Sequence, residues 1–525
     1  MKESVSTYSL QALSSPLDAG QAKHLLDRCL FGAKKSEVDA FVGKTIEEAL
    51  NILTALPPEV PLPIGIRAED LEVPIGNSWI NTKDNTNYAG YRLYSLHSWW
   101  LGNLQQQRIF LTEKMILFGH NHWVTKGDTV WNSSFLYQYN QLLRKYALGN
   151  WKQLASEMCI LPAMLSFLNG NANKIGAPNE NFARELFELF TIGKGPLIGE
   201  GNYTTYTETD VEEAAKVLTG WRNNGSTASS YFDTKLHDSS TKTFSPAFGN
   251  QTIANQQGEE YKLLIDMIFS QKETARFLTR KIYRWFTYYQ IDQVIEDQVI
   301  EPLATTLFDN NYEIKPLLVQ LLSSEHFFSA DYRGAMIKNP MDFSIGLLHK
   351  LELELSPDQL SNYQFWWDLV YVYISNMGML LSQPPDIAGW TPFYQAPGFN
   401  ELWINSATVP ARTTFSNLLC GSGITKNGFK YGIDPLLLSV QISEAGNPNA
   451  LIGGLAEVLF SLPISTKKST QLKEILLPGL SDSTWTTEWN KYLNAPTNET
   501  QKDVLRKRLT PLIAAMLKMP EFYLC

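Results

Sequence analysis

The stretch Asn179–Gly195, NENFARELFELFTIGKG, decides the fold class. An ideal helix turns by about 100° per residue. If Phe182 is set at 0°, Leu186 lies at about 40° and Phe190 at about 80°, so three large apolar side chains share one face. Glu185 falls at about 300°, inside the same apolar arc. The pattern predicts an amphipathic helix that packs against the rest of the protein.

The carboxylate of Glu185 needs an explanation, because it lies between Leu189 and Ile192 on this helical wheel. A carboxylate in an apolar face is costly unless a cation, a metal ion or several hydrogen-bond donors accompany it. Glu188 lies three residues further on, at the border of the arc, and is its neighbour on the helix surface. Two interpretations stand: a buried ion pair with an arginine such as Arg184, or functional carboxylates.

The same helical period recurs along nearly the whole chain and is interrupted by irregular stretches at about 57–90, 220–256 and 382–410. The sequence therefore predicts a mainly α protein, a large bundle-like fold of many helices in a single unit, with long irregular loops and at most a small β-hairpin. We expect a main helical body over residues 1–430 and a helical segment over 431–525 that packs on it. The clearest helical stretches are Gln21–Phe31, Thr45–Leu56, Tyr91–Phe118, Phe135–Ala147, Trp151–Leu165, Asp210–Thr219, Lys262–Phe286, Val299–Leu307, Pro316–Ser324, Met341–Leu351 and Gln364–Leu380.

The charge balance limits the partners of the protein. The sequence contains 44 Lys and Arg residues and 53 Asp and Glu residues, which gives a formal net charge of −9. Nucleic-acid binding and polybasic membrane-surface binding both need a basic surface, so neither is predicted. No run of 18 or more apolar residues is present, so no membrane span is predicted. The first residues lack the apolar region of a signal peptide, so we expect a cytoplasmic protein, with export if a native leader has been removed.

Histidine is scarce, with seven in the chain, and two of them stand in the segment FGHNHW, residues 118–123. On a helix His120 and His122 would diverge by about 200°, so they share a face only if the chain is extended there. Gly119 favours that interpretation, because a glycine can end the preceding helix. The pair could then bind one metal ion; the alternative is two histidines that fill polar niches near a helix end.

A second histidine candidate lies in the polar stretch 220–256. His237 stands beside Asp238, where a loop imidazole could act as a ligand or as a general base held by its neighbour. The alternative is an ordinary solvated loop. Long loops in a compact protein are often functional, which keeps both interpretations open.

Several common catalytic motifs are absent from the sequence. There is no GxGxxG, no GxxxxGK[ST], no GxSxG and no HExxH, which removes the usual dehydrogenase, NTPase, α/β-hydrolase and zincin assignments. The four cysteines are far apart and form no CxxC pair, so a zinc ribbon or a thioredoxin motif is not expected.

Nine segments in a fixed order resemble the bacterial family known as domain of unknown function 1800. The resemblance implies a mostly helical fold, frequent export, and association with a partner protein similar to sulfatases and alkaline phosphatases. The sequence departs from the family pattern at Phe190, where histidine is usual, and at Gly119, where tryptophan is usual. The segments are HLLDRCLFG (24–32), EKMILFGHNHW (113–123), NENFARELFELFTIG (179–193), YTETDVEEAAKVLTGW (206–221), HDSSTKTF (237–244), FLTRKIYRWF (277–286), QPPDIAGW (383–390), WINSATVPAR (403–412) and MPEFYL (519–524).

These segments contain the polar residues already selected, and we expect them to converge on one site. A set of imidazoles and carboxylates suits zinc, iron or manganese, with His120, His122 and Glu185 as ligands. It also suits metal-free acid–base chemistry, with Glu185, Glu188, His237 and Asp238 as the catalytic groups. Three functions are compatible with the sequence: an enzyme acting on an envelope or extracellular polymer, a non-catalytic binding or assembly protein that works with a partner, and a helical scaffold.

Overall fold

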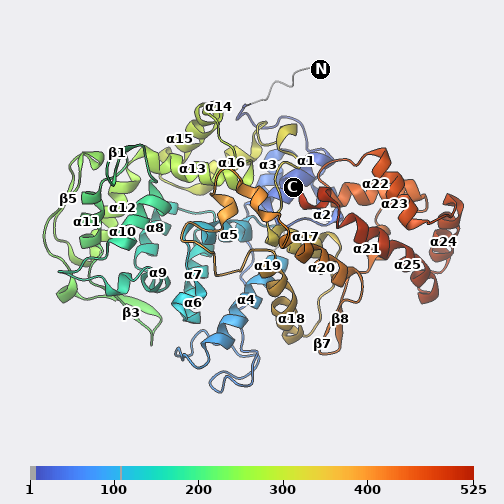
Figure 1. Cartoon of the computed structure of the whole chain (residues 1–525), viewed down its shortest axis with the longest axis horizontal. Helices are drawn as coiled ribbons and strands as arrows, with labels where there is room; N and C mark the ends of the chain where they lie inside the picture. The colour runs from blue at the N-terminus through green and yellow to red at the C-terminus, as the bar shows by residue number, and fades with distance from the viewer. Residues whose placement is uncertain (1–7, 107–108) are drawn as a thin grey trace.

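The computed structural model describes residues 8–106 and 109–525, and it confirms a mainly α fold. Figure 1 shows an elongated molecule with its C-terminal helices at one end and the helices of residues 150–290 at the other. The first part of the chain forms α1 (Ala19–Cys29), α2 (Lys35–Phe41), α3 (Ile46–Leu53), α4 (Ala89–Gln106), α5 (Thr112–His122), α6 (Gly127–Val130), α7 (Ser133–Lys145), α8 (Trp151–Cys159), α9 (Pro162–Phe167), α10 (Glu180–Glu185) and α11 (Glu208–Val217).

The remaining helices belong to the middle and the end of the chain. Within the described residues, no helix is both long and apolar enough to span a bilayer. The helices are α12 (Glu260–Phe269), α13 (Lys272–Phe286), α14 (Gln293–Ile295), α15 (Glu301–Asp309), α16 (Ile314–Ser323), α17 (Pro340–Lys350), α18 (Gln359–Phe365), α19 (Val372–Asn376), α20 (Thr408–Cys420), α21 (Pro435–Ser439), α22 (Pro448–Leu459), α23 (Thr466–Leu476), α24 (Asp482–Asn494) and α25 (Glu499–Met516).

The described residues form four short antiparallel hairpins, whereas the sequence predicts at most one. The predicted one is present in 220–256, where strand β3 pairs with β4, and β5 pairs with β6 in the same stretch. Two further pairs, β1 with β2 and β7 with β8, lie elsewhere. The strands are β1 (Leu197–Gly199), β2 (Asn202–Tyr203), β3 (Trp221–Asn224), β4 (Ser229–Phe232), β5 (Lys242–Thr243), β6 (Thr252–Ile253), β7 (Ile424–Lys426) and β8 (Phe429–Tyr431).

The helix boundaries follow local chemistry. Asp18 caps α1 by accepting from the Gln21 backbone N–H at 2.7 Å, while the Gln21 side chain accepts from the Asp18 N–H.

The predicted stretches 91–118 and 262–286 each hold two helices, because periodicity alone does not mark a short break. Residues 107 and 108 lie outside the described residues. One continuous hydrophobic core runs from α1 to the last helices. The division at residue 430 stays a prediction.

Candidate functional site

The helix that decides the fold class changes its geometry at Glu185. Regular α-helix ends there, and Leu186–Thr191 continue as a π-helix, η2. The predicted apolar face is buried, since Phe182, Leu186 and Phe190 are almost fully inaccessible. The wider π turn shifts backbone carbonyl groups out of line, and such segments are frequent at functional sites.

Glu185 forms no ion pair with any of the described residues. Arg184 pairs with Glu208 instead, with its Nη1 atom 2.6 Å from Oε1, so the predicted arginine pair does not form. Burial, together with the like charges of Glu188 and Asp386, raises the pKa of Glu185 to about 7. A carboxyl group with this pKa can exchange a proton near neutrality.

Glu188, by contrast, is fully engaged. Its carboxylate forms an ion pair with Lys194 and accepts a hydrogen bond from the Tyr206 hydroxyl at 3.2 Å. The two predicted carboxylates therefore differ: Glu188 is a paired carboxylate that Lys194 and Tyr206 hold in place, and Glu185 is half-buried with no ion pair among the described residues.

The backbone of the FGHNHW segment is helical, which corrects the expectation that Gly119 ends the helix. Helix α5 continues to His122, so the His120 and His122 side chains point in different directions. Gly119 serves another purpose: a Cβ atom there would lie 2.9 Å from Cδ2 of Leu143. The glycine lets α7 approach α5 closely.

His120 is buried beside Tyr139. The Nδ1 atom of His120 lies 2.9 Å from the Tyr139 hydroxyl, which in turn donates to the Trp123 carbonyl oxygen at 2.6 Å. Burial lowers the pKa of His120 to about 3, so the ring is neutral. Its Nε2 atom is buried with no hydrogen-bond partner in the described part of the chain.

His122 contacts the π-helix. Its Nε2 atom donates to the Phe190 carbonyl oxygen at 2.9 Å, and its Nδ1 atom lies 3.4 Å from Nζ of Lys281. Lys281 also donates to the Leu189 carbonyl oxygen at 2.9 Å. Burial, reinforced by the nearby Arg284, lowers the pKa of Lys281 to about 7. The carbonyl groups displaced by the π turn thus find side-chain donors.

His237 belongs to a separate, closed network. Its Nε2 atom lies 2.8 Å from Glu260 Oε1, and the other oxygen of Glu260 lies 2.6 Å from Lys242 Nζ. The backbone N–H of Asp238 donates to the Thr219 hydroxyl at 2.8 Å. The partners of His237 and Asp238 hold the long loop against α11 and α12, and they do not include the other predicted site residues.

The expected metal site is not supported. Within residues 8–106 and 109–525, no three His, Cys, Asp or Glu side chains gather in a way that could hold a metal ion. The six polar residues are divided among the half-buried carboxyl group of Glu185, the ion pair of Glu188 with Lys194, the His120–Tyr139 pair, the contact of His122 with the π-helix, and the loop network that contains His237 and Asp238.

Four of the predicted segments do meet around the end of α5. Besides the contacts of His122 and Lys281, the backbone N–H of Trp390 donates to Asn121 Oδ1 at 2.9 Å. Gly389, at φ 106°, allows this approach, because a Cβ atom there would lie 2.4 Å from the same oxygen. These contacts of the His122 ring, the Lys281 ammonium group and the Asn121 amide hold the four segments together.

A cleft of about 790 Å³ lies elsewhere, between α1–α2 and the C-terminal helices α22–α23. Figure 1 shows these two helix pairs side by side. The volume is within the range of roughly 300–1,000 Å³ that is typical of small-molecule sites. Its apolar lining residues are Val38, Ile442, Val458, Phe460, Leu462, Pro463 and Ile464.

Among the described residues that line the cleft, Arg333 is the cationic side chain without a carboxylate partner. Lys23 pairs with Asp27 at 2.6 Å, and Lys35 pairs with Asp39 at 2.6 Å. The buried Nε atom of Arg333 has no hydrogen-bond partner among the described residues. Arg333 therefore offers a guanidinium group to whatever occupies the cleft.

Small residues on α22 keep the cleft open. Gly453 lines the cleft, and a Cβ atom on it would meet no atom within 4 Å. Gly454, beside it, also lines the cleft, but a Cβ atom there would lie 2.3 Å from Cγ2 of Ile442. A side chain at Gly453 would therefore extend into the cleft.

Neither Arg333 nor Gly453 was selected from the sequence. Arg333 follows a short turn and does not lie in a helix with a regular apolar face, so the residues around it give no reason to select it. The GG pair at 453–454 inside a helical stretch is a signal, because glycine costs about 1 kcal/mol relative to alanine in a helix and usually has a packing or functional reason.

Comparison with known proteins adds one match. A family model described as "Protein of unknown function (DUF1800)" matches residues 24–524. No curated protein matches the chain, and no solved structure matches it.

Proposed function

Since the chain belongs to the DUF1800 family, whose description states no activity, we propose a function from geometry: the protein binds a small amphipathic ligand, with an apolar body and one acidic group, in the cleft between α1–α2 and α22–α23. The observation that carries the proposal is the free guanidinium of Arg333 in a ligand-sized, largely apolar cleft. This is the binding-protein function among those compatible with the sequence.

The polarity of the cleft supports an acidic ligand. Burial lowers the pKa of His24 to about 3, so this lining residue is neutral at physiological pH. Asp39 is already paired with Lys35, and Glu457 is exposed at the rim. An acidic group that reached Arg333 would gain a charge-assisted hydrogen bond from a donor that is otherwise buried without one.

A fluorescent probe with the same chemistry tests the proposal. Anilinonaphthalene sulfonate has an apolar body and one acidic group, and its binding is followed by fluorescence titration. We expect saturable binding to the intact chain with one site. Gly453→Leu should weaken it strongly, because the leucine side chain would occupy part of the cleft, starting from a Cβ position with no protein atom within 4 Å. Arg333→Gln should weaken it about tenfold or more, as expected for loss of one charged hydrogen bond.

The control is Gly225→Leu, since a Cβ atom at that turn glycine also meets nothing within 4 Å and Gly225 is not among the residues that line the cleft. It should bind the probe like the unmodified protein. Equal binding in the Gly453→Leu variant would place the probe elsewhere and contradict the proposal.

A second function, acid–base catalysis at Glu185 on an envelope or extracellular polymer, is favoured by the pKa of about 7 of its unpaired carboxyl group. We propose peptidoglycan as the first substrate to test, with release of soluble fragments as the measurement. Glu185→Gln should remove any release while Glu180→Gln, an exposed carboxylate on the same helix, keeps it. The sulfatase-like partner protein implied by the family resemblance would be sought by co-purification.

A further inference from the structure

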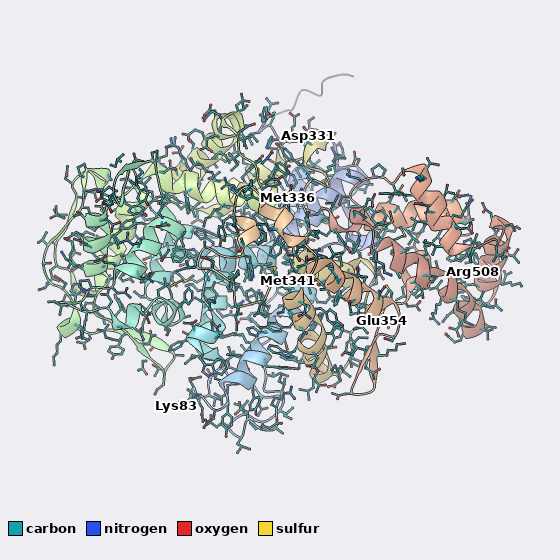
Figure 2. The ribbon with its side chains drawn as sticks, viewed as in Figure 1. Lys83, Asp331, Met336, Met341, Glu354 and Arg508 are labelled. Carbon is teal, nitrogen blue, oxygen red and sulfur yellow. The ribbon has the colours of Figure 1, made fainter. Side chains whose placement is uncertain are left out.

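A second, smaller cavity lies in the middle of the molecule, where α1, α5, α13, α17 and the loop before α20 meet. Its volume is about 20 Å³. A cavity needs about 10–15 Å³ by this kind of measure to hold a single water molecule, so one compact species fits. Met336, labelled in Figure 2 near the centre of the molecule, forms part of its wall.

Among the described residues that line this cavity, the side-chain atoms without a hydrogen-bond partner are N–H donors, except for Asp27 Oδ1, which lies 2.8 Å from Nζ of Lys350. Arg28, Trp285 and Asn400 all line it, and they are 3%, 6% and 3% exposed. The Nε and Nη1 atoms of Arg28, Nε1 of Trp285 and Nδ2 of Asn400 have no hydrogen-bond partner within the described chain. Arg28 uses only Nη2, which donates to the Tyr332 carbonyl oxygen at 2.7 Å. Four buried donors thus border one small space.

The carboxylates at the cavity are already neutralised by other cations. Asp27 lies 2.6 Å from Nζ of Lys23 and 2.8 Å from Nζ of Lys350, and the second contact occupies Oδ1. Asp342 pairs with Lys114 and accepts from the Asn339 amide at 2.7 Å. Neither carboxylate is paired with Arg28.

Positive charge exceeds negative charge throughout this region. Besides Arg28, the buried Lys338 donates to the Phe522 carbonyl oxygen at 2.7 Å and forms no ion pair within the part of the chain that the structure describes. The fully buried Arg412 uses Nη2 on the Lys338 carbonyl oxygen at 2.9 Å and leaves Nε and Nη1 free. Among the described side chains, Arg28, Lys338 and Arg412 are therefore buried cations without a carboxylate partner. The two carboxylates near them, Asp27 and Asp342, are already paired with lysines. An uncompensated buried charge is expensive.

We propose that this cavity is a binding site for a compact monovalent anion of halide size, held by Arg28, Trp285 and Asn400. Such an anion accepts from all three side chains at once and neutralises the guanidinium. A water molecule suits the site less well, because it carries no charge to offset the buried guanidinium of Arg28. The anion would join the first helix, α13 and the loop before α20, so it would stabilise the fold.

The test compares thermal unfolding of the full chain in sodium chloride and in sodium gluconate at equal ionic strength. A ligand that binds the folded state alone raises the unfolding temperature with its concentration. We expect chloride to raise the temperature and gluconate not to do so. Crystals grown in bromide should show an anomalous peak between Arg28, Trp285 and Asn400.

The decisive variant is Trp285→Phe, which removes one free N–H donor and no hydrogen bond within the protein. It should raise the chloride concentration for half-maximal stabilisation at least fivefold. Trp151→Phe is the matched control, since its buried Nε1 atom is also unpartnered and Trp151 is not among the residues lining this cavity. Equal unfolding in both salts would overturn the proposal. Bromide in the crystal without a chloride effect in solution, an adventitious ion only, would also overturn it.

Discussion

The Nε2 atom of His122 lies 2.9 Å from the carbonyl oxygen of Phe190 and joins the end of α5 to the π-helix. Burial, together with the charge of Lys281, holds the pKa of His122 well below its usual value, so the ring donates as neutral imidazole. The histidine is thus a structural donor to a carbonyl group that the π turn has displaced from the helix.

Replacing His122 by phenylalanine should leave the Phe190 carbonyl oxygen without its donor. We expect a loss of about 1–3 kcal/mol in the free energy of unfolding, measured by urea denaturation. His97→Phe is the control, because both ring nitrogens of the buried His97 lack partners among the described residues and its ring stacks on Tyr371. That variant should lose nothing or gain stability. Equal losses in both would mean that the hydrogen bond contributes nothing specific.

Metal removal should leave the protein unchanged, because the described residues hold no set of three metal-binding side chains. We expect the same unfolding temperature before and after dialysis against EDTA, and no stoichiometric metal by elemental analysis. A marked fall in the unfolding temperature after dialysis, reversed by zinc, would restore the predicted site at His120, His122 and Glu185.

The sequence predicted the helices well because an apolar face has a period that can be counted. The sequence also identified Glu185 as a carboxyl group in an apolar arc, and burial raises the pKa of this group in the folded chain. Arg28 could have been found in the same way: on a helical wheel it lies about 60° from Leu25, within the buried side of α1.

What the sequence did not predict depends on local geometry and on distant partners. The π-helix requires one extra residue in a turn, which periodicity does not resolve over six residues. The contacts of Glu260 with His237 and with Lys242 depend on how the loop folds back on α12. Gly119 carries two equally good explanations in a sequence, a helix end and a close helix contact, and only the position of Leu143 decides between them.

Substitution of Gly119 by alanine tests that contact. The new Cβ atom would lie 2.9 Å from Leu143, so overpacking of about 1–3 kcal/mol should exceed the gain of up to about 1 kcal/mol from better helix propensity. We expect a net destabilisation of about 1 kcal/mol by urea denaturation. Gly453→Ala, in open space on α22, should instead be neutral or stabilising. Stabilisation by both would show that α5 and α7 separate easily.

The loop network should be costly to break. Burial alone would raise the pKa of Glu260, but hydrogen bonds from His237 and Lys242 lower it. Glu260→Gln leaves the fully buried Lys242 without its carboxylate, at a cost of about 3–5 kcal/mol in the free energy of unfolding. Glu259→Gln, next to it, breaks only an exposed pair with Lys262 and should change stability by under about 0.5 kcal/mol. A small effect of Glu260→Gln would mean that Lys242 is neutral or reaches solvent.

Glu185 should give the protein a distinctive pH dependence. Its pKa is about 7 in the folded chain and 4.5 in the unfolded one. Between these values the folded state holds a proton that the unfolded state has lost, so stability falls as the pH rises from 4.5 through 7 and then levels off. Glu185→Gln removes this term. The variant should match the parent near pH 4.5 and exceed it by about 1–2 kcal/mol above pH 7, since solvent reduces the ~3 kcal/mol that the full shift would imply.

Asp386→Asn separates the two causes of this effect. It removes a like charge near Glu185 and leaves burial unchanged, so the pH-dependent term should shrink without disappearing. Urea denaturation at pH 4.5, 6 and 8 measures both variants. If Glu185→Gln and the parent differ by the same amount at every pH, the carboxyl group titrates normally in the folded chain. Acid–base catalysis at neutral pH would then lose the observation on which it rests.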